Sequence, residues 1–391
     1  MGQVALGHVA FTGLGVFRRR YYGSSQISTA ACWGFGMNAE TRSFQVRVPC
    51  TSSNIGPGFD VVGLSLSLYL TLDVTVDPSK ADQRAPVLSY TGEGAEEAPL
   101  DPYKNMITRV ALYVLRVNGK SSFPTGVSMH VTNEIPFGRG LGSSGAAVVS
   151  GLLLGNELGQ LNIPRDRLLD YALMVERHPD NVTAALIGGF VGSYLRELEG
   201  EDAATTQVPL SEVLREYPPD AGESWGRSPP TPPQHIGHYV RFNWAPEIQV
   251  IAIVPHFEVA TAEARRVLPE KYAKKDLVFN LQRLAVLTTT LARSPPDAEL
   301  IFEAMQDRVH QPYRKHLIPG LPRILASVTP ATHPGLLGIC LSGAGPTILA
   351  LATHNLEQIA QTLTSEFARE NITSDTKFLK VIQQGAQLTR S

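Results

Sequence analysis

A glycine-rich loop between a predicted strand and a predicted helix constrains this chain more than any other segment. Residues 136–147 read PFGRGLGSSGAA and follow the alternating stretch Val127–Glu134, which predicts a strand. The glycines let the backbone pass close to an anion, and the apolar run after them predicts a helix over Ser144–Leu158. A helix N-terminus presents unpaired N–H groups and the positive end of the helix dipole. The segment therefore predicts a phosphate-binding strand–loop–helix unit.

This loop differs from two well-known nucleotide-binding loops. It lacks the Gly-Lys-Ser/Thr end of a Walker loop, and its glycines are not spaced as in the dinucleotide fingerprint. The hydroxyl of Ser143 or Ser144 stands where it could ligate the Mg²⁺ of a nucleotide. On the glycines alone, a turn with no ligand remains the alternative.

The composition excludes several classes of function. The chain has 391 residues and a net charge of -2, so it offers no basic field for nucleic acid or an anionic membrane. No apolar stretch is long enough to span a bilayer, and the 3 cysteines show no metal-ligand spacing. We expect a cytoplasmic protein. Residues 1–39 lack Asp and Glu and carry three consecutive arginines, so an organelle transit segment is the alternative for this stretch.

Strand and helix patterns alternate in mixed order, which predicts an α+β fold with two domains. We expect a disordered extension over 1–42, an N-terminal domain over 43–235 and a C-terminal domain over 236–391. The proline-rich stretch 199–235 is expected to be an exposed insertion or linker. The predicted strands cover 43–49, 66–76, 127–134, 239–243, 249–255, 337–341, 347–352 and 377–382. The predicted helices cover 105–117, 144–158, 165–175, 260–268, 276–293, 297–307 and 356–370.

Two further segments carry clustered polar side chains. In TSSNIGPGFD (51–60), Asn54 and Asp60 flank a Gly-Pro-Gly turn, and an amide oxygen with a carboxylate suits a substrate amine. The alternative is a tight connection in which both side chains bond the backbone. In ERHPDN (176–181), Glu176 at the end of a predicted helix could supply a carboxylate to a metal ion. Taken alone, the rest of that segment would be a turn with a structural histidine.

Three features nearer the C-terminus complete the set. The segment CLSGAGPT (340–347) either turns a hairpin or brings backbone close to a ligand. Arg265 lies in ATAEARRVLP and Arg314 in QPYRKHLIPG. Each alone would be a solvated surface arginine, but together they could clamp a carboxylate.

Read together, these segments resemble the GHMP small-molecule kinases, a family that includes galactokinase, homoserine kinase and mevalonate kinase. That family has three ordered motifs, the second of which is P-x-x-x-G-L-G-S-S-[AG]-A. Here the motifs fall at 51–60, 136–147 and 341–347, and the resemblance covers about residues 43–391. Within the family, the chain resembles the fungal-like homoserine kinase branch through NIGPGFD, HPDN, TAEARRVLP and the D-x-x-x-x-P-Y-R-x-x-L-I-P-G segment from Asp307 to Gly320.

The resemblance implies a fold and an activity. The N-terminal domain would resemble domain 2 of ribosomal protein S5, and the C-terminal domain would be ferredoxin-like. The activity would be Mg-ATP-dependent phosphorylation of the L-homoserine hydroxyl to O-phospho-L-homoserine, a step toward threonine. The expected partners are L-homoserine and ATP, without nucleic acid or membrane, in a possible homodimer.

The resemblance also implies roles for individual residues. Asn54 and Asp60 would hold the homoserine amino group, and Arg265 and Arg314 its carboxylate. His178, Asp180 and Asn181 would line the same pocket, with Asn181 near the attacking hydroxyl and Asp180 either a general base or, as we favour, an anchor. Ser144 and Glu176 would meet Mg²⁺. The residues implied for ATP are Asn105, Pro136, Gly138, Arg139, Gly140, Leu141, Gly142, Ser143, Ser144, Gly145, Ala146, Gly343 and Gly345.

Three rival functions remain open on the sequence. One is a GHMP kinase for another alcohol. Another is a non-catalytic ligand sensor related to galactokinase, but intact serines and alanines over 143–147 favour an enzyme. The third is a decarboxylase of phosphorylated mevalonate, which gives no reason for Arg265 and Arg314 together with Asn54 and Asp60.

Overall fold

Two β-sheets, each covered by helices, build the part of the chain that the computed structural model describes, residues 40–215 and 228–391. These residues belong to one compact unit, Ala39–Ser391. The extension expected over 1–42 lies outside the described residues, apart from its last three positions. The candidate transit segment, residues 1–39, lies entirely outside them.

The first sheet has seven strands and is almost entirely antiparallel. Alternating residues of its strands face a core on one side: in β1, Phe44, Val46 and Val48 are buried, while Gln45 and Arg47 between them are exposed. The pairing order is β11 (Gln387–Arg390), β1 (Arg42–Ser53), β2 (Val62–Val76), β4 (Val127–Asn133) and β3 (Val87–Gly92), with β5 (Phe190–Leu195) joining β2 to β6 (Gly237–Phe242). Only the pair β3–β4 is parallel.

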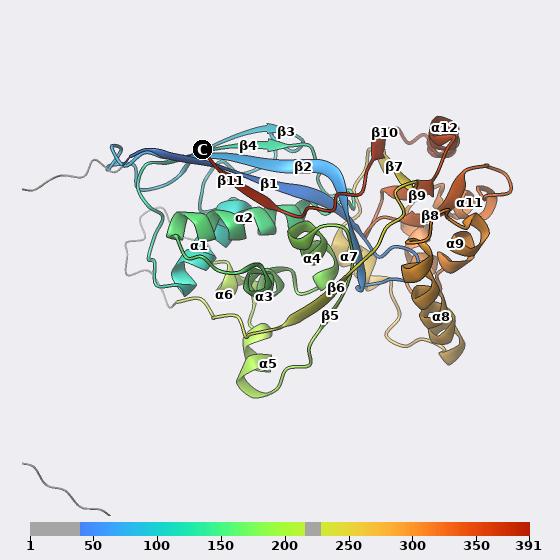
Figure 1. Ribbon diagram of the computed structural model, residues 1–391, viewed down its shortest axis with the longest axis horizontal. Helices are drawn as coiled ribbons and strands as arrows, with labels where there is room; N and C mark the ends of the chain where they lie inside the picture. The colour runs from blue at the N-terminus through green and yellow to red at the C-terminus, as the bar shows by residue number, and fades with distance from the viewer. Residues whose placement is uncertain (1–39, 216–227) are drawn as a thin grey trace, which may run out of the picture. The chain divides into compact units, whose positions relative to one another are not determined.

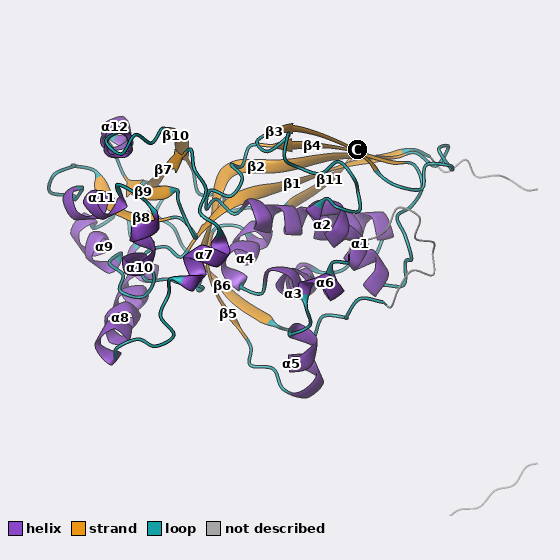
Figure 2. Cartoon of the chain, turned by 180° about the vertical axis from the view of Figure 1, so that it is seen from behind, coloured by secondary structure: helices purple, strands orange, loops and turns teal. Residues whose placement is uncertain are grey.

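Helices cover the buried face of this sheet (Figures 1 and 2). α2 (Ser143–Gly159) and α4 (Pro179–Ile187) lie against the sheet. α1 (Met106–Val117) packs against α2, and α3 (Arg165–Glu176) packs against α2 and α4. The first turn of α2 lies at the end of the glycine-rich loop, and buried residues surround the helix on most sides. The core thus holds fixed the helix whose N-terminus ends that loop.

The second sheet is antiparallel throughout, and its strands other than the edge strand β10 are buried on both faces. Its order is β10 (Ser374–Leu379), β7 (Gln249–Pro255), β9 (Ile348–Ala352) and β8 (Leu336–Leu341). Alternation in β7 divides two cores: Val250, Ala252 and Val254 face one, and Ile251 and Ile253 face the other. The first core is closed by α8 (Lys274–Thr290) and α9 (Ala298–Ala304), and the second by α11 (Leu321–Ser327) and α12 (Leu356–Ala368). The remaining short helices in this half are α7 (Thr261–Arg266), α10 (Gln311–Arg314) and the 3-10 turn Lys315–Leu317.

The two sheets do not divide at residue 236. Strands β6 and β11 lie beyond that position, yet both pair into the first sheet, where Phe44 of β1 stands opposite Arg390 of β11. Phe44 and Arg390 are more than 300 residues apart, so no local pattern in the sequence predicts their pairing. The domain boundary expected between residues 235 and 236 remains a prediction.

The proline-rich stretch 199–235 is exposed over most of 199–212 and packs against the fold at most of its other described residues. It contains α5 (Gly200–Thr206) and α6 (Leu210–Val213), and Val213 and Leu214 are buried. The guanidinium of Arg167 donates to the carbonyls of Pro232 and Pro233, both at 2.6 Å. Carbonyls remain acceptors in a proline run, so the partly buried Arg167 binds this segment against α3. Residues 216–227 lie outside the described part.

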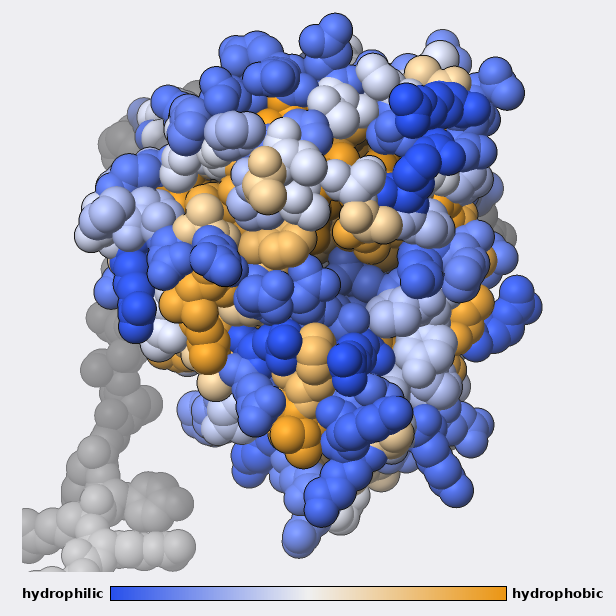
Figure 3. All heavy atoms as spheres, turned by 90° about the vertical axis from the view of Figure 1, so that its right-hand side faces the viewer, coloured by the Kyte–Doolittle hydropathy of each residue, from blue (hydrophilic) through white to orange (hydrophobic). Residues whose placement is uncertain are grey.

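Surface hydropathy is mixed on the side formed by the second sheet, where apolar side chains stand in separate patches among polar ones (Figure 3). Several of the exposed apolar residues belong to α8, among them Leu277, Val278 and Leu281. Within the described ranges, none of the helices has the length and apolar character needed to cross a membrane.

Candidate active site

Three loops far apart in the sequence are bonded together where the two sheets meet. The backbone N–H of Thr51 donates to the carbonyl of Leu141 at 3.1 Å, and that of Gly343 donates to the carbonyl of Ser53 at 2.9 Å. The hydroxyl of Ser342 lies 2.7 Å from the carbonyl of Gly140. The segments 51–60, 136–147 and 340–347 therefore form one structural unit.

The glycines of the central loop are required by backbone conformation and by space. Gly138, Gly140 and Gly142 have φ of 61°, 82° and 70°, in the left-handed region. A Cβ on Gly142 would lie 2.0 Å from the Thr51 hydroxyl oxygen, and one on Gly140 2.4 Å from the Ser342 carbonyl oxygen. The loop can therefore pass this close to its two neighbouring segments only with glycine at these positions.

The three loops surround a pocket with a volume of ≈ 170 Å³. The N-terminus of α2 opens into it, with no side-chain cap on that helix start. The first N–H groups of a helix have no intrahelical acceptors, so this end suits an anion. The lining residues are Ser53, Asn54, Gly138, Gly140, Gly142, Ser143, Ser144, Gly145, Glu176, His178, Asp180, Asn181, Val259, Thr261, Arg265, Arg314, Gly343, Ala344 and Gly345.

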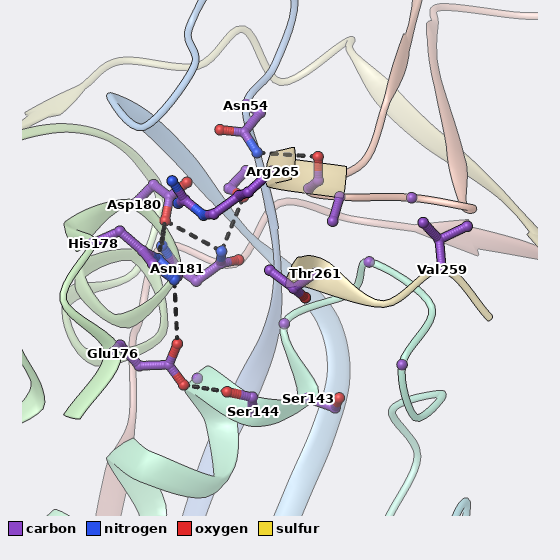
Figure 4. Close-up of a pocket in the computed structure, with 18 of the residues that line it drawn as sticks. Asn54, Ser143, Ser144, Glu176, His178, Asp180, Asn181, Val259, Thr261 and Arg265 are labelled. Carbon is purple, nitrogen blue, oxygen red and sulfur yellow. Dashed lines mark hydrogen bonds and ion pairs between the residues drawn. The ribbon is translucent and has the colours of Figure 1, made fainter. Parts of the chain in front are cut away.

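A chain of oxygen and nitrogen groups crosses the floor of the pocket (Figure 4). The hydroxyl of Ser144 donates to Glu176 Oε1. Glu176 Oε2 lies 3.6 Å from His178 Nε2, and His178 Nδ1 lies 3.2 Å from Asp180 Oδ1. Burial alone lowers the pKa of His178, but the hydrogen bond and charge of Asp180, with the charge of Glu176, outweigh it and raise that pKa. The imidazole thus lies between two carboxylates that favour its protonated form.

Asn181 is fixed by strand β1. Its Nδ2 donates to the Ser53 hydroxyl at 2.9 Å, and its Oδ1 accepts from the Thr51 hydroxyl at 2.7 Å. Its backbone N–H donates to Asp180 Oδ1 at 2.7 Å. Asp180 itself is 1% exposed, in the first turn of α4. Both side chains are therefore held rigidly at the pocket wall.

Asn54 joins the first and third loops. Its Oδ1 accepts the backbone N–H of Asp60 at 2.9 Å, and its Nδ2 donates to the carbonyl of Gly343 at 3.0 Å. The backbone-bonding alternative left open by the sequence therefore holds for the Asn54 amide. One lone pair of Oδ1 is left for a further donor.

Asp60 and Arg265 form a two-point ion pair beside the pocket. The guanidinium Nη2 lies 2.8 Å from Oδ1, and Nη1 lies 3.1 Å from Oδ2. Both side chains are about one third exposed, at 32% and 39%. Solvent therefore weakens the attraction between the two charges, so either residue can bind another charged group instead.

Arg314 is a buried cation without a carboxylate partner among the described residues. It is 1% exposed, with Nε bonded to the carbonyl of Ala264 at 3.0 Å and Nη1 to that of Gly343 at 3.2 Å. Burial, followed by the like charge of Arg265, lowers its pKa to about 10. The group stays charged at neutral pH, so it favours an anion in the pocket it lines.

Comparison with known proteins places this geometry in a family. The N-terminal domain of GHMP kinases matches residues 105–189, and the C-terminal domain of GHMP kinases matches residues 289–369. The homoserine kinase of Saccharomyces cerevisiae is 57% identical over 354 residues, covering 89% of this chain and 99% of that protein. The chain belongs to the GHMP kinase family.

Other relatives agree with this membership. The homoserine kinase of Candida albicans is 49% identical over 354 residues, covering 88% of this chain and 97% of that protein. The crystal structure of homoserine kinase from Cytophaga hutchinsonii matches with a TM-score of 0.67 and 26% identity. The match covers 88% of this chain and 97% of that one. The predicted α+β GHMP kinase fold and the resemblance to fungal relatives are thus confirmed.

Some residues that the GHMP kinase resemblance implied for ATP lie outside this pocket. Asn105 caps α1, with Oδ1 accepting from the N–H of Ile107 and Nδ2 donating to the carbonyl of Pro99. Arg139 donates to the carbonyl of Pro255 at 3.1 Å. Pro136, Leu141 and Ala146 are buried around the loop without lining the pocket. Arg139 and the three buried residues hold the loop in place, and Asn105 holds the start of α1.

The structure adds residues that the sequence analysis did not select. Ser53, Val259, Thr261 and Ala344 line the pocket. Thr261 stands within the TAEARRVLP segment and Ser53 directly before Asn54, so proximity to known motifs was the available signal. His310, within the segment that contains Arg314, had no signal of its own.

Proposed function

We propose that this GHMP kinase is a homoserine kinase, which transfers the γ-phosphoryl group of ATP to the side-chain hydroxyl of L-homoserine. The observation that carries the proposal is the pocket itself. One end is the glycine-rich loop and the α2 N-terminus, and the other carries Arg314 and Arg265. Asp60 does not line the pocket but pairs with Arg265 beside it. An amino acid with a terminal hydroxyl would bridge these two ends. The names and near-complete coverage of the two fungal relatives support this choice of substrate.

The phosphate end supports binding of ATP. The backbone of the loop over Gly138–Gly142 and the first turn of α2 present N–H groups to the pocket, and they suit the phosphates. The hydroxyls of Ser143 and Ser144 lie at the same end. The buried Pro136, Leu141 and Ala146 hold the loop in this conformation.

The donor set beside the phosphates fits Mg²⁺. Ser144 and Glu176 present a hydroxyl and a carboxylate to each other, and hard oxygen ligands of this kind suit the ion. Within the described residues, three or more His, Cys, Asp and Glu side chains nowhere gather as for a metal held by protein alone. A site that shares its metal with nucleotide phosphates needs fewer protein ligands. Bound there, Mg²⁺ would neutralise charge on the transferring phosphoryl group.

The other end supports recognition of an amino acid. Asp60 and the remaining Asn54 lone pair suit the substrate ammonium, and Arg265 and Arg314 suit its carboxylate. Each charge-assisted contact would contribute about 1.5–3 kcal/mol to binding. Mevalonate lacks the ammonium group and galactose lacks both charges, so this pocket favours homoserine over either.

The chemistry relies on positioning. Phosphoryl transfer proceeds through a loose transition state that draws little on the nucleophile, so a strong base is not required. Asn181 would orient the attacking hydroxyl, because Thr51 and Ser53 fix both ends of its amide. Asp180 would act as an anchor for the substrate and not as a general base, since its Oδ1 already accepts hydrogen bonds from Asn181 and His178. The rigid wall thereby holds the hydroxyl in line with the phosphates.

A coupled assay of ADP release tests the proposal. The full chain with Mg-ATP is given L-homoserine, mevalonate or galactose in parallel. We expect turnover with homoserine at a kcat/KM at least about a hundred-fold above that with either other alcohol, because only homoserine fills both charged subsites. Equal or greater turnover with mevalonate or galactose would overturn the choice of substrate. ADP release with none of the three would overturn homoserine as the substrate and favour a GHMP kinase for another alcohol or a ligand sensor.

A further inference from the structure

His310 lies behind the pocket wall and touches the guanidinium of Arg314. It is completely buried and does not line the pocket. Its Nδ1 is 3.5 Å from Arg314 Nη1, and its Nε2 is 2.8 Å from the carbonyl oxygen of Gly56. His310 directly precedes α10, and Arg314 ends that helix. The contact therefore stays within a single turn of chain.

The surroundings of His310 define which ring nitrogen carries the proton. The Gly56 carbonyl can only accept, so Nε2 must be protonated. Asp307 Oδ2, 3.4 Å from the same nitrogen, is also an acceptor. Burial lowers the pKa of His310 against the opposing effect of Asp307. The guanidinium of Arg314 has only donors, so Nδ1, which faces it, offers its lone pair.

Neighbouring groups leave this arrangement little freedom. Asp307 does not bond Arg314: its two oxygens accept backbone N–H groups at the start of α10 and the amide of Asn280 at 2.7 Å. The ring of Phe59 stacks on His310, with centroids 5.5 Å apart and an interplanar angle of 24°. The same ring lies 5.0 Å from the Arg314 guanidinium carbon. Both charged and aromatic neighbours thus fix the imidazole plane.

The contacts of Arg314 account for one side of its guanidinium. Nε donates to Ala264, and the two N–H groups of Nη1 face Gly343 and His310. No residue in the described ranges bonds Nη2. The donors that remain for a ligand are therefore on Nη2, at the wall of the pocket.

We propose that His310 is a positioning residue: its Nδ1 accepts from Arg314 and so turns Nη2 toward the carboxylate of the substrate amino acid. The inference rests on the proposed function, because it needs a substrate with that carboxylate. His310 does not touch the substrate. Its effect passes entirely through the orientation of Arg314.

Two substitutions separate the two bonds of the imidazole. His310→Asn keeps an acceptor near Nδ1 and loses the donor to Gly56, whereas His310→Gln keeps a donor near Nε2 and loses the acceptor for Arg314. We expect His310→Gln to raise the KM for L-homoserine about five-fold or more, with the KM for ATP unchanged. We expect His310→Asn to raise it less than half as much. L-homoserinol, which has a hydroxymethyl group in place of the carboxylate, should respond equally little to both substitutions.

The outcomes are distinguishable. If the wild-type chain does not phosphorylate homoserine, the proposed function fails and this inference with it. If the wild type is active but His310→Gln keeps its KM, or His310→Asn is the more impaired, His310 only holds the Gly56 turn and the inference fails alone. Equal losses with homoserinol would also overturn it. Should either variant not fold, His310→Ala with added imidazole is the second test: imidazole must lower the KM for homoserine toward the wild-type value, and no effect would overturn the inference.

Discussion

Asp60 and Arg265, 205 residues apart in the chain, bond each other at both oxygens of the carboxylate. The resemblance to GHMP kinases implies opposite ends of the substrate for these two residues, the ammonium for Asp60 and the carboxylate for Arg265. The structure pairs them, so that each compensates the charge of the other. A bound amino acid would therefore insert its own opposite charges alongside an existing pair, and the two residues would act as a unit.

This pairing predicts non-additive effects on substrate binding. Asp60→Asn and Arg265→Gln should each raise the KM for homoserine about ten-fold or more, and the double variant should raise it by clearly less than the product. Steady-state kinetics on the four proteins measures the coupling. Glu157→Gln is the matched control, because Glu157 forms a comparable two-point pair with Arg390 on the surface. Multiplicative effects of the two substitutions would show that Asp60 and Arg265 act independently.

Arg314→Leu should raise the KM for homoserine at least about ten-fold and leave that for ATP unchanged. The reason is that a buried cation without a carboxylate partner is removed from the amino-acid end of the pocket. Arg323→Leu is the control, since Arg323 is paired with Glu366 and Glu370 away from the pocket. An unchanged homoserine dependence in Arg314→Leu would remove Arg314 from the substrate site.

Ser144→Ala should lower kcat about ten-fold or more and raise the Mg²⁺ concentration needed for half-maximal rate, because one oxygen ligand is lost. The measurement is rate against free Mg²⁺ at saturating ATP and homoserine. Ser150→Ala, on the same helix but in the core, should leave the Mg²⁺ dependence unchanged. If the rate of Ser144→Ala depended on Mg²⁺ as the wild-type rate does, Ser144 would be excluded as a ligand.

Asp180→Asn distinguishes an anchor from a general base. As an anchor, Asp180 can be replaced by an amide that still accepts from Asn181, so kcat should fall by no more than about ten-fold. The pH dependence of kcat should keep its shape. A loss of about a hundred-fold or more, with the acidic limb of the pH profile gone, would instead identify Asp180 as the base.

The raised pKa of His178 predicts a pH-dependent contribution to stability. A group whose pKa is higher in the folded than in the unfolded chain stabilises fully below its unfolded pKa, about 6.5 for histidine, and this stabilisation is lost as pH rises through the folded value. His178→Gln should therefore lower Tm more at pH 6 than at pH 9. Thermal unfolding at both pH values measures the difference. A loss of Tm that is the same at both would show that the imidazolium is not stabilised by Asp180 and Glu176.

The local elements around the site could be predicted from sequence because their signals are local. The alternation over Val127–Asn133, the glycines at positive φ and the apolar run of α2 each follow from neighbouring residues. Strand β1 extends to Ser53 and β2 begins at Val62, so the first loop is shorter than expected. Helix α4, expected to be a turn, begins at Pro179, a residue suited to the first helical position.

The sequence by itself determined the glycine-rich loop before α2, the family and the set of charged residues proposed for a substrate. Only the tertiary structure decided that Asn54 bonds the third loop, that Asp60 pairs with Arg265, and that His310 supports Arg314 from behind. The physical reason is the distance along the sequence over which each kind of interaction acts. Backbone conformation and helix or strand periodicity depend on residues a few positions apart, whereas these contacts join side chains whose meeting depends on how two sheets pack.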